Sequence, residues 1–145
     1  MVYNKYVLIH LGIAVKRKGI KMKISDIKVL ICDDSVLVRK KMSDILKGVG
    51  IHDITEAKDG IQAVEFFKMK MPDLTFMDIV MPEKTGLEAL EEIRAFNPNA
   101  KVVMASTIGT QNNLSAAIKA GAFDFLQKPV EEEDIYKIIN TFTKE

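Results

Sequence analysis

The sequence predicts a single α/β domain with a five-stranded parallel sheet and helices on both of its faces. Between residues 26 and 145, apolar runs of strand length alternate with amphipathic segments of helix length. This alternation is typical of parallel sheets with right-handed crossovers. The strand-like runs are nearly continuously apolar, as expected where both faces of a sheet are covered. With 145 residues, 48% of them apolar, the chain is long enough to bury one good core.

The first predicted strand covers residues 27–32, and Ser35 is placed to cap the helix that follows it. Gly48 and Gly50 are expected to end that helix. Its apolar positions keep the spacing of one helix face: Val38, Met42, Ile45, Leu46 and Val49. The sequence therefore predicts where this helix begins, which of its faces is buried and where it ends.

A weaker strand is expected over residues 51–57, and the helix after it starts at Asp59-Gly60 and carries Ile61, Val64 and Phe67. Residues 74–77 form the third predicted strand, because Pro72 discourages continuation of the preceding helix. The helix after Pro82 ends at Asn97-Pro98, and its apolar positions are Leu87, Leu90 and Ile93.

Residues 101–105 and 122–126 are the last two predicted strands. The helix between them stops at Gly121, with Leu114, Ala117 and Ile118 as its apolar positions. The final helix presents one apolar stripe, made by Ile135, Ile138, Ile139 and Phe142.

Polar side chains stand at the ends of four of these strands. Asp33 and Asp34 follow the first strand, Asp78 follows the third, Ser106 the fourth and Lys128 lies just beyond the fifth. Ligands of open parallel sheets bind beyond the carboxyl ends of the strands, so we expect these side chains to converge. Three neighbouring carboxylates repel one another and need a cation, and Mg²⁺ also bridges to phosphate oxygens. The ammonium and the hydroxyl would contact a phosphoryl group.

These motifs carry a family resemblance. Over roughly residues 26–143 the chain resembles the receiver domain of two-component response regulators. The matching segments are residues 29–35, Asp59-Gly60, residues 72–74, residues 77–82, Gly86, residues 120–122 and Lys128-Pro129. The resemblance implies a flavodoxin-like (βα)5 domain with strand order 2-1-3-4-5, the order known for flavodoxin and CheY.

The resemblance also implies a role for each acidic residue. Asp78 would be the phosphoacceptor, attacking a phosphohistidine on a partner kinase. Asp33 and Asp34 would hold Mg²⁺ together with Asp78 and the backbone carbonyl of Val80. The aliphatic side chain of Val80 stands where many family members have a polar one, and it cannot orient an attacking water.

The same resemblance implies a conformational switch. Ser106 would move toward the phosphoryl group, and Phe125 falls at the family's switch aromatic, which turns inward as the hydroxyl moves. Because Phe125 lacks the hydroxyl of a tyrosine, its two states should differ by packing alone. Lys128-Pro129 resembles the family's cis peptide, which would aim the ammonium at the site.

Residues 103–111 and 120–125 look most like those of stand-alone CheY-type chemotaxis regulators. The expected partners are a CheA-like histidine kinase as phosphodonor, a flagellar motor switch component downstream and a phosphatase. A single-domain phosphorelay carrier, or another receiver not linked to motility, is the alternative. The chain is expected to be a phosphoacceptor signalling protein that assists its own Mg²⁺-dependent phosphotransfer and dephosphorylation, not an enzyme. A haloacid-dehalogenase-type phosphatase is disfavoured, because Val80 stands where such enzymes have a second aspartate.

Charge divides the chain into two parts. Residues 1–25 hold six Lys or Arg and no acidic residue, whereas residues 26–145 hold 15 basic and 20 acidic side chains, a net charge of −5. We predict a basic N-terminal extension over residues 1–25 and a receiver domain over residues 26–145. The body lacks the basic stripe of a nucleic-acid-binding surface. One hypothesis is that residues 1–21 lie upstream of a natural start at Met22; the alternative is a basic amphipathic element that contacts a membrane or partner.

The single cysteine, Cys32, lies in an apolar run and is expected to be reduced and buried in a cytoplasmic protein. The two histidines have no partners at zinc-ligand spacing. The apolar stretch near the N-terminus is too short for a transmembrane helix.

Overall fold

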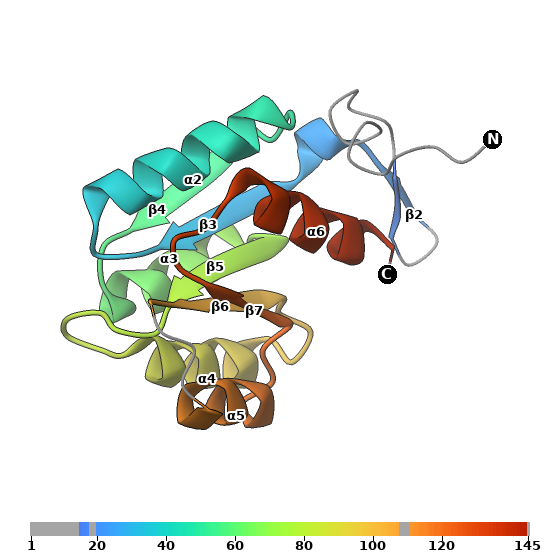
Figure 1. Ribbon diagram of the computed structural model, residues 1–145. Coiled ribbons are helices and arrows are strands. Elements are labelled where there is room, and N and C mark those ends of the chain that lie inside the picture. The colour runs from blue at the N-terminus through green and yellow to red at the C-terminus, as the bar shows by residue number, and fades with distance from the viewer. Residues whose placement is uncertain (1–14, 18–19, 108–110, 145) are drawn as a thin grey trace.

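A five-stranded parallel sheet forms the centre of the molecule in the computed structural model, which describes residues 15–17, 20–107 and 111–144 (Figure 1). The strands lie in the order β4-β3-β5-β6-β7. Counted from the first strand of this sheet, that order is 2-1-3-4-5, so the predicted fold is confirmed. The strand bounds are Lys28–Cys32 for β3, Asp53–Ala57 for β4, Leu74–Asp78 for β5, Val102–Ser106 for β6 and Asp124–Gln127 for β7.

Five helices cover the two faces of this sheet (Figure 1). Helices α2 and α6 lie on one face, and α3, α4 and α5 lie on the other. Their bounds are Val36–Gly48 for α2, Gly60–Lys70 for α3, Gly86–Phe96 for α4, Gln111–Lys119 for α5 and Glu132–Thr143 for α6. The architecture is therefore a three-layer α/β/α sandwich.

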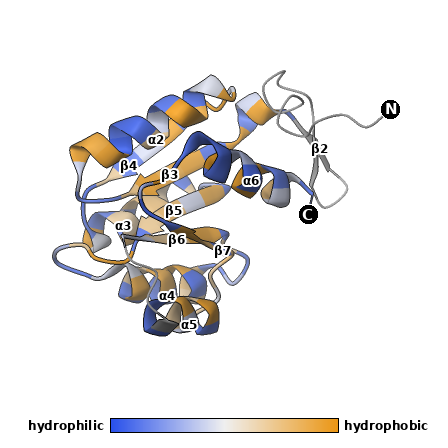
Figure 2. Cartoon of the chain, viewed as in Figure 1, coloured by the Kyte–Doolittle hydropathy of each residue, from blue (hydrophilic) through white to orange (hydrophobic). Residues whose placement is uncertain are grey.

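Each face of the sheet has its own buried cluster. Along β3, Val29 and Ile31 join the cluster beneath α2 and α6, whereas Leu30 and Cys32 join the cluster beneath α3, α4 and α5. Successive side chains of a strand point to opposite faces, so both sets must be apolar. Figure 2 shows the resulting hydrophobic strands. The nearly continuous apolar runs of the sequence are explained by this double burial.

The helix faces are only partly as predicted. The α6 stripe is confirmed, since all four of its predicted apolar residues are buried. Ile61 is wrongly placed on the buried face of α3, because it is 48% exposed and Ala63 is buried instead. In α5, Leu114 and Ile118 are exposed by 38% and 65%, so the three predicted positions do not share one buried face.

The last strand is displaced from its predicted bounds. It begins at Asp124, because Ala122 is still part of the turn that closes α5, where its amide donates to the carbonyl of Ala117 at 2.9 Å. Gly121 supplies the left-handed backbone that this turn requires, with φ of 89°. The predicted stop at Gly121 is correct, and the turn extends beyond it.

A short hairpin precedes the sheet and was not predicted. Strands β1 (Val15–Arg17) and β2 (Ile20–Met22) pair in antiparallel fashion, and the 3-10 turn η1 (Ile24–Asp26) leads into β3. The remaining residues of the predicted extension, 1–14 and 18–19, lie outside the described residues. The domain boundary and the start at Met22 stay predictions. Among the described residues, no helix has the length and apolarity needed to cross a membrane.

Thr75, in the middle of β5, offers a test of the core. Its side chain is fully buried and its hydroxyl makes no hydrogen bond to any described residue. A buried hydroxyl without a partner opposes folding, so Thr75→Val should raise the free energy of unfolding by about 1 kcal/mol. Urea unfolding of both proteins measures the difference. Thr75→Ser, which keeps the hydroxyl and removes the methyl group, should be less stable than the parent; a destabilised Thr75→Val would contradict the prediction.

Candidate functional site

The predicted polar residues meet at the carboxyl edge of the sheet. Asp78 ends β5 and Ser106 ends β6, whereas Asp33 and Asp34 follow β3 and Lys128 follows β7. Carboxylate oxygens of the three aspartates all lie within 4.8 Å of one another. A pocket of about 400 Å³ contains all five residues, together with Ser35, Val38, Val80 and Thr107. The predicted convergence is confirmed.

The acidic residues differ in their exposure. Asp33 and Asp78 are 3% and 8% exposed, whereas Asp34 is exposed to solvent. Buried carboxylates are rare unless they are paired with a cation. The first partner is Lys128, whose Nζ donates to Oδ2 of Asp33 and lies 3.4 Å from Oδ2 of Asp78. One ammonium group thus faces two carboxylates.

The backbone around Lys128 directs this ammonium into the site. The Lys128–Pro129 peptide is cis, as the sequence predicts. The amide of Lys128 donates to the carbonyl of Ser106 at 2.7 Å, which ties the end of β7 to the end of β6. Burial alone would lower the pKa of Lys128, but its hydrogen bond to Asp33 and the charges of Asp33 and Asp78 raise that pKa above its ordinary value. Lys128 therefore stays a cation.

Asp78 has the opposite electrostatic balance. Burial raises its pKa, and the charge of Asp33 adds to this effect. Lys128 and the Val80 amide, which donates to Oδ1 of Asp78 at 3.4 Å, lower the pKa but only in part offset the rise. The ionised form of Asp78 is therefore short of positive charge, and a hard divalent cation at the three carboxylates would supply it. The donor set fits Mg²⁺.

Two glycines hold the chain segment after Asp78 in place. Gly86 donates its amide to the carbonyl of Ile79 at 2.8 Å, and a Cβ atom at Gly86 would lie 1.9 Å from the carbonyl oxygen of Asp78. At Gly60, a Cβ atom would lie 2.0 Å from the carbonyl oxygen of Lys84. Side chains at these positions would push on the backbone that carries the site.

The proposed switch residues, Ser106 and Phe125, lie on the neighbouring strands β6 and β7. Phe125 is partly buried and packs against the cluster beneath α3, α4 and α5. Ser106 is buried at 5% exposure, and Val80 is 73% exposed. The inward and outward states of Phe125 stay a prediction.

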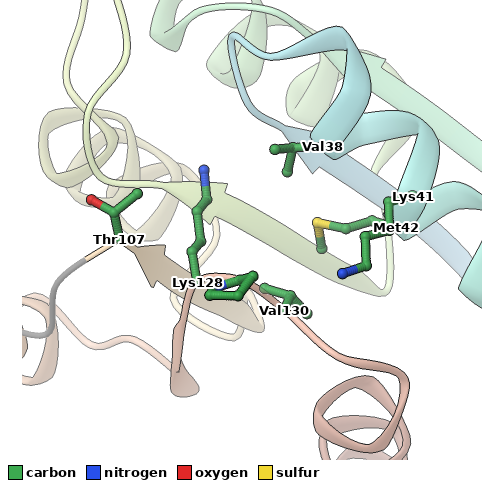
Figure 3. Close-up of a pocket in the computed structure, with 7 residues that line it drawn as sticks. Val38, Lys41, Met42, Thr107, Lys128 and Val130 are labelled. Atoms are coloured by element: carbon green, nitrogen blue, oxygen red, sulfur yellow. The ribbon is translucent and has the colours of Figure 1, made fainter.

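A second cavity adjoins the acidic pocket. It has a volume of about 430 Å³ and lies between α2 and the segment after β7 (Figure 3). It shares Val38, Thr107 and Lys128 with the acidic pocket, and its walls are mainly apolar. Figure 3 shows Lys128 between Thr107 and the α2 residues. The lining residues not shared are Lys41, Met42, Pro129 and Val130.

Sequence reasoning missed one residue of the site, Arg39. Its Nη1 donates to the main-chain carbonyl of Asp33 at 2.6 Å, and its Nε donates to Oε1 of Glu56 at 2.9 Å. Arg39 lies on the first turn of α2, just after the cap Ser35, and that position was the available signal.

Comparison with known proteins identifies the family. The model of the response regulator receiver domain matches residues 29–140. This chain belongs to that family. Membership places this receiver domain among phosphorylation-dependent response regulators.

Several of the most similar curated relatives of this receiver domain are named chemotaxis protein CheY. It is 40% identical to chemotaxis protein CheY of Thermotoga maritima over 81% of this chain and 98% of that protein. It is 42% identical to chemotaxis protein CheY of Bacillus subtilis, over 78% of this chain and 94% of that protein. A protein named CcdB from Bacillus subtilis is 40% identical over 78% and 94%.

Solved structures give the same fold. A crystal structure of a CheX–CheY complex with beryllium fluoride and Mg²⁺ from Borrelia burgdorferi matches with a TM-score of 0.76 and 32% identity, over 79% of this chain and 87% of that one. Chemotaxis protein CheY4 of Vibrio cholerae matches with a TM-score of 0.75 and 26% identity, over 80% and 98%.

Asp78→Asn tests what it costs this receiver domain to bury an ionised Asp78 beside Asp33. A pKa raised by folding means that stability is lost as pH rises from the unfolded pKa, about 3.9, through the folded pKa, and stays lower above it. Without Mg²⁺, Asp78→Asn should therefore unfold at higher urea than the parent at pH 7, and this gain should vanish below about pH 3. Urea unfolding across pH measures it. Asp44→Asn, at an exposed carboxylate outside the cluster, should show no such gain; a lower midpoint for Asp78→Asn at pH 7 would contradict a cost of ionising Asp78 in the folded protein.

Gly86→Ala tests the support of Asp78. The added methyl group would overlap the Asp78 carbonyl, so the variant should lose about 1–3 kcal/mol of stability. Gly48→Ala is the matched control, because a Cβ atom there meets nothing within 4 Å and alanine favours a helix by about 0.5–1 kcal/mol over glycine. Thermal unfolding should separate the two variants in opposite directions. Equal stability of Gly86→Ala and the parent would show that the segment adapts.

Proposed function

We propose that this receiver domain accepts a phosphoryl group on Asp78 from a histidine kinase and signals by binding another protein. The observation that carries the proposal is the convergence of three carboxylates and an ammonium at one end of the sheet, around the buried Asp78. Membership of the receiver family supports it. The proposal also places the protein in the cytoplasm, with such a kinase.

The chemistry assigns a task to each residue. An ionised oxygen of Asp78 attacks the phosphorus of a phosphohistidine; a P–O bond forms, the P–N bond breaks, and the imidazole nitrogen keeps the electron pair. Lys128, whose Nζ lies 3.4 Å from Oδ2 of Asp78, neutralises charge on the phosphoryl oxygens. The hydroxyl of Ser106 donates a hydrogen bond to an oxygen of the transferred phosphoryl group. Asp33 keeps Lys128 ionised and in place.

Mg²⁺ would be held by Asp33, Asp34, Asp78 and the backbone carbonyl of Val80. When bound, it would neutralise negative charge on the carboxylates and on the phosphoryl group. The close grouping of three carboxylate oxygens supports this set.

We further propose that the pathway is chemotaxis. Relatives named chemotaxis protein CheY from Thermotoga, Bacillus and other sources, at 37–42% identity, support this proposal. A CheA-like kinase would then be the phosphodonor and a flagellar motor switch component the downstream partner, with a phosphatase ending the signal. Ser106 and Phe125 would be the switch pair that changes the binding surface.

A phosphorelay carrier is the second candidate function. The similar protein named CcdB bears no chemotaxis name, and the same acidic site could pass a phosphoryl group to another histidine. Phosphate-dependent binding to a motor switch peptide favours chemotaxis. Transfer from phosphorylated Asp78 to a histidine phosphotransfer protein favours the relay.

Phosphorylation itself is tested with a small phosphodonor such as acetyl phosphate. With Mg²⁺ the protein should gain the mass of one phosphoryl group, and the gain should be lost in Asp78→Asn and after chelation with EDTA. Intact-mass spectrometry reads the result. Asp44→Asn should be modified like the parent, and modification of Asp78→Asn to the same extent would overturn the assignment.

A further inference from the structure

Arg39 connects three elements next to the acidic pair. It lies on α2, its Nη1 donates to the carbonyl of Asp33 at the end of β3, and its Nε donates to Glu56 on β4. The Arg39 side chain is only 13% exposed and its bond to Asp33 is partly buried, whereas the Glu56 side chain is 45% exposed. The planar guanidinium fork suits two acceptors held in fixed relation.

The bond to Asp33 fixes the peptide unit that leads to Asp34. A peptide unit is planar, so the carbonyl oxygen of Asp33 and the amide nitrogen of Asp34 move together. The amide of Asp33 is held as well, since it donates to the carbonyl of Ala57 at 3.0 Å. The backbone is thus fastened immediately before Asp34.

Asp34 needs this support more than Asp33 does. The Asp33 carboxylate accepts from the amide of Ser35 at 2.9 Å and from Lys128. The Asp34 carboxylate is exposed and has no hydrogen bond or ion pair with any residue that the structure describes. Its position beside the other two carboxylates is therefore set by its backbone.

A positive charge beside a cation site would weaken cation binding. The charge of Glu56 compensates for that of Arg39. Its carboxylate lies 2.9 Å from Nε of Arg39 and balances the guanidinium charge. Because Glu56 balances its charge, Arg39 affects the site mainly through the hydrogen bond that holds the Asp33 carbonyl.

We propose that Arg39 is a positioning residue for the divalent-cation site, holding the Asp33–Asp34 peptide so that the Asp34 carboxylate joins those of Asp33 and Asp78. This inference rests on the proposed Mg²⁺ site. It predicts that metal affinity falls when the fork is removed, although removal of a cation alone would raise it.

Calorimetric titration of the full chain with Mg²⁺, without a phosphodonor, tests the proposal. Arg39→Met keeps the aliphatic stem, removes the donors and should raise the Kd for Mg²⁺ about tenfold, as loss of an outer-shell partner typically does. Arg39→Lys keeps the charge but cannot reach both acceptors, so its Kd should rise too. Lys40→Met is the matched control: Lys40 is 71% exposed and pairs with Asp44, and its loss should leave the Kd unchanged or lower it.

The outcomes separate the two proposals. If the parent protein binds no Mg²⁺, the proposed metal site fails and this inference fails with it. If the parent binds Mg²⁺ and the Arg39 variants bind it as tightly or more tightly, only the positioning role is overturned. Thermal unfolding without Mg²⁺ shows which variants are folded, and Arg39→Lys decides the question should Arg39→Met not fold.

Discussion

The repulsion among Asp33, Asp34 and Asp78 is the constraint on which the rest of the site depends. Their oxygens lie within 4.8 Å of one another, and two of the three side chains are buried. Lys128 is one cation against three anions, and it is bound more closely to Asp33 than to Asp78. Burial raises the pKa of Asp78 most, the charge of Asp33 raises it further, and Lys128 offsets the rise only in part. A group in that state gains from any added positive charge.

The surrounding backbone maintains this arrangement against its own repulsion. The β6–β7 tie through the Lys128 amide, the close approach of Gly86 to the Asp78 carbonyl and the Arg39 bond to the Asp33 carbonyl each fix main chain, not side chain. Main-chain restraints leave the carboxylates available for ligands. The site therefore combines a restrained main chain with carboxylates that line a pocket, and the Asp34 side chain is exposed there.

Sequence alone predicts the fold and the principal residues because both follow from local rules. Apolar runs mark the strands, and parallel strands bring their carboxyl ends to one edge, so Asp33, Asp78 and Lys128 had to meet. Arg39 could not be found in this way. Its role depends on a main-chain oxygen at the end of β3 and on Glu56 of β4, seventeen positions away in sequence. Ile61 and Ile118 were misplaced for a related reason: helical spacing gives a stripe but not how much of it the sheet covers.

The separation of the core into two clusters has a consequence for signalling. Phe125 packs in the layer of α3, α4 and α5, whereas Met42 of α2, the helix that carries Arg39, packs with α6 in the other layer. The sheet separates these two layers. The proposed switch at Phe125 would therefore repack one layer, while α2, the helix that carries Arg39, packs in the other. Both layers pack on the same sheet, whose central strand β5 ends at Asp78.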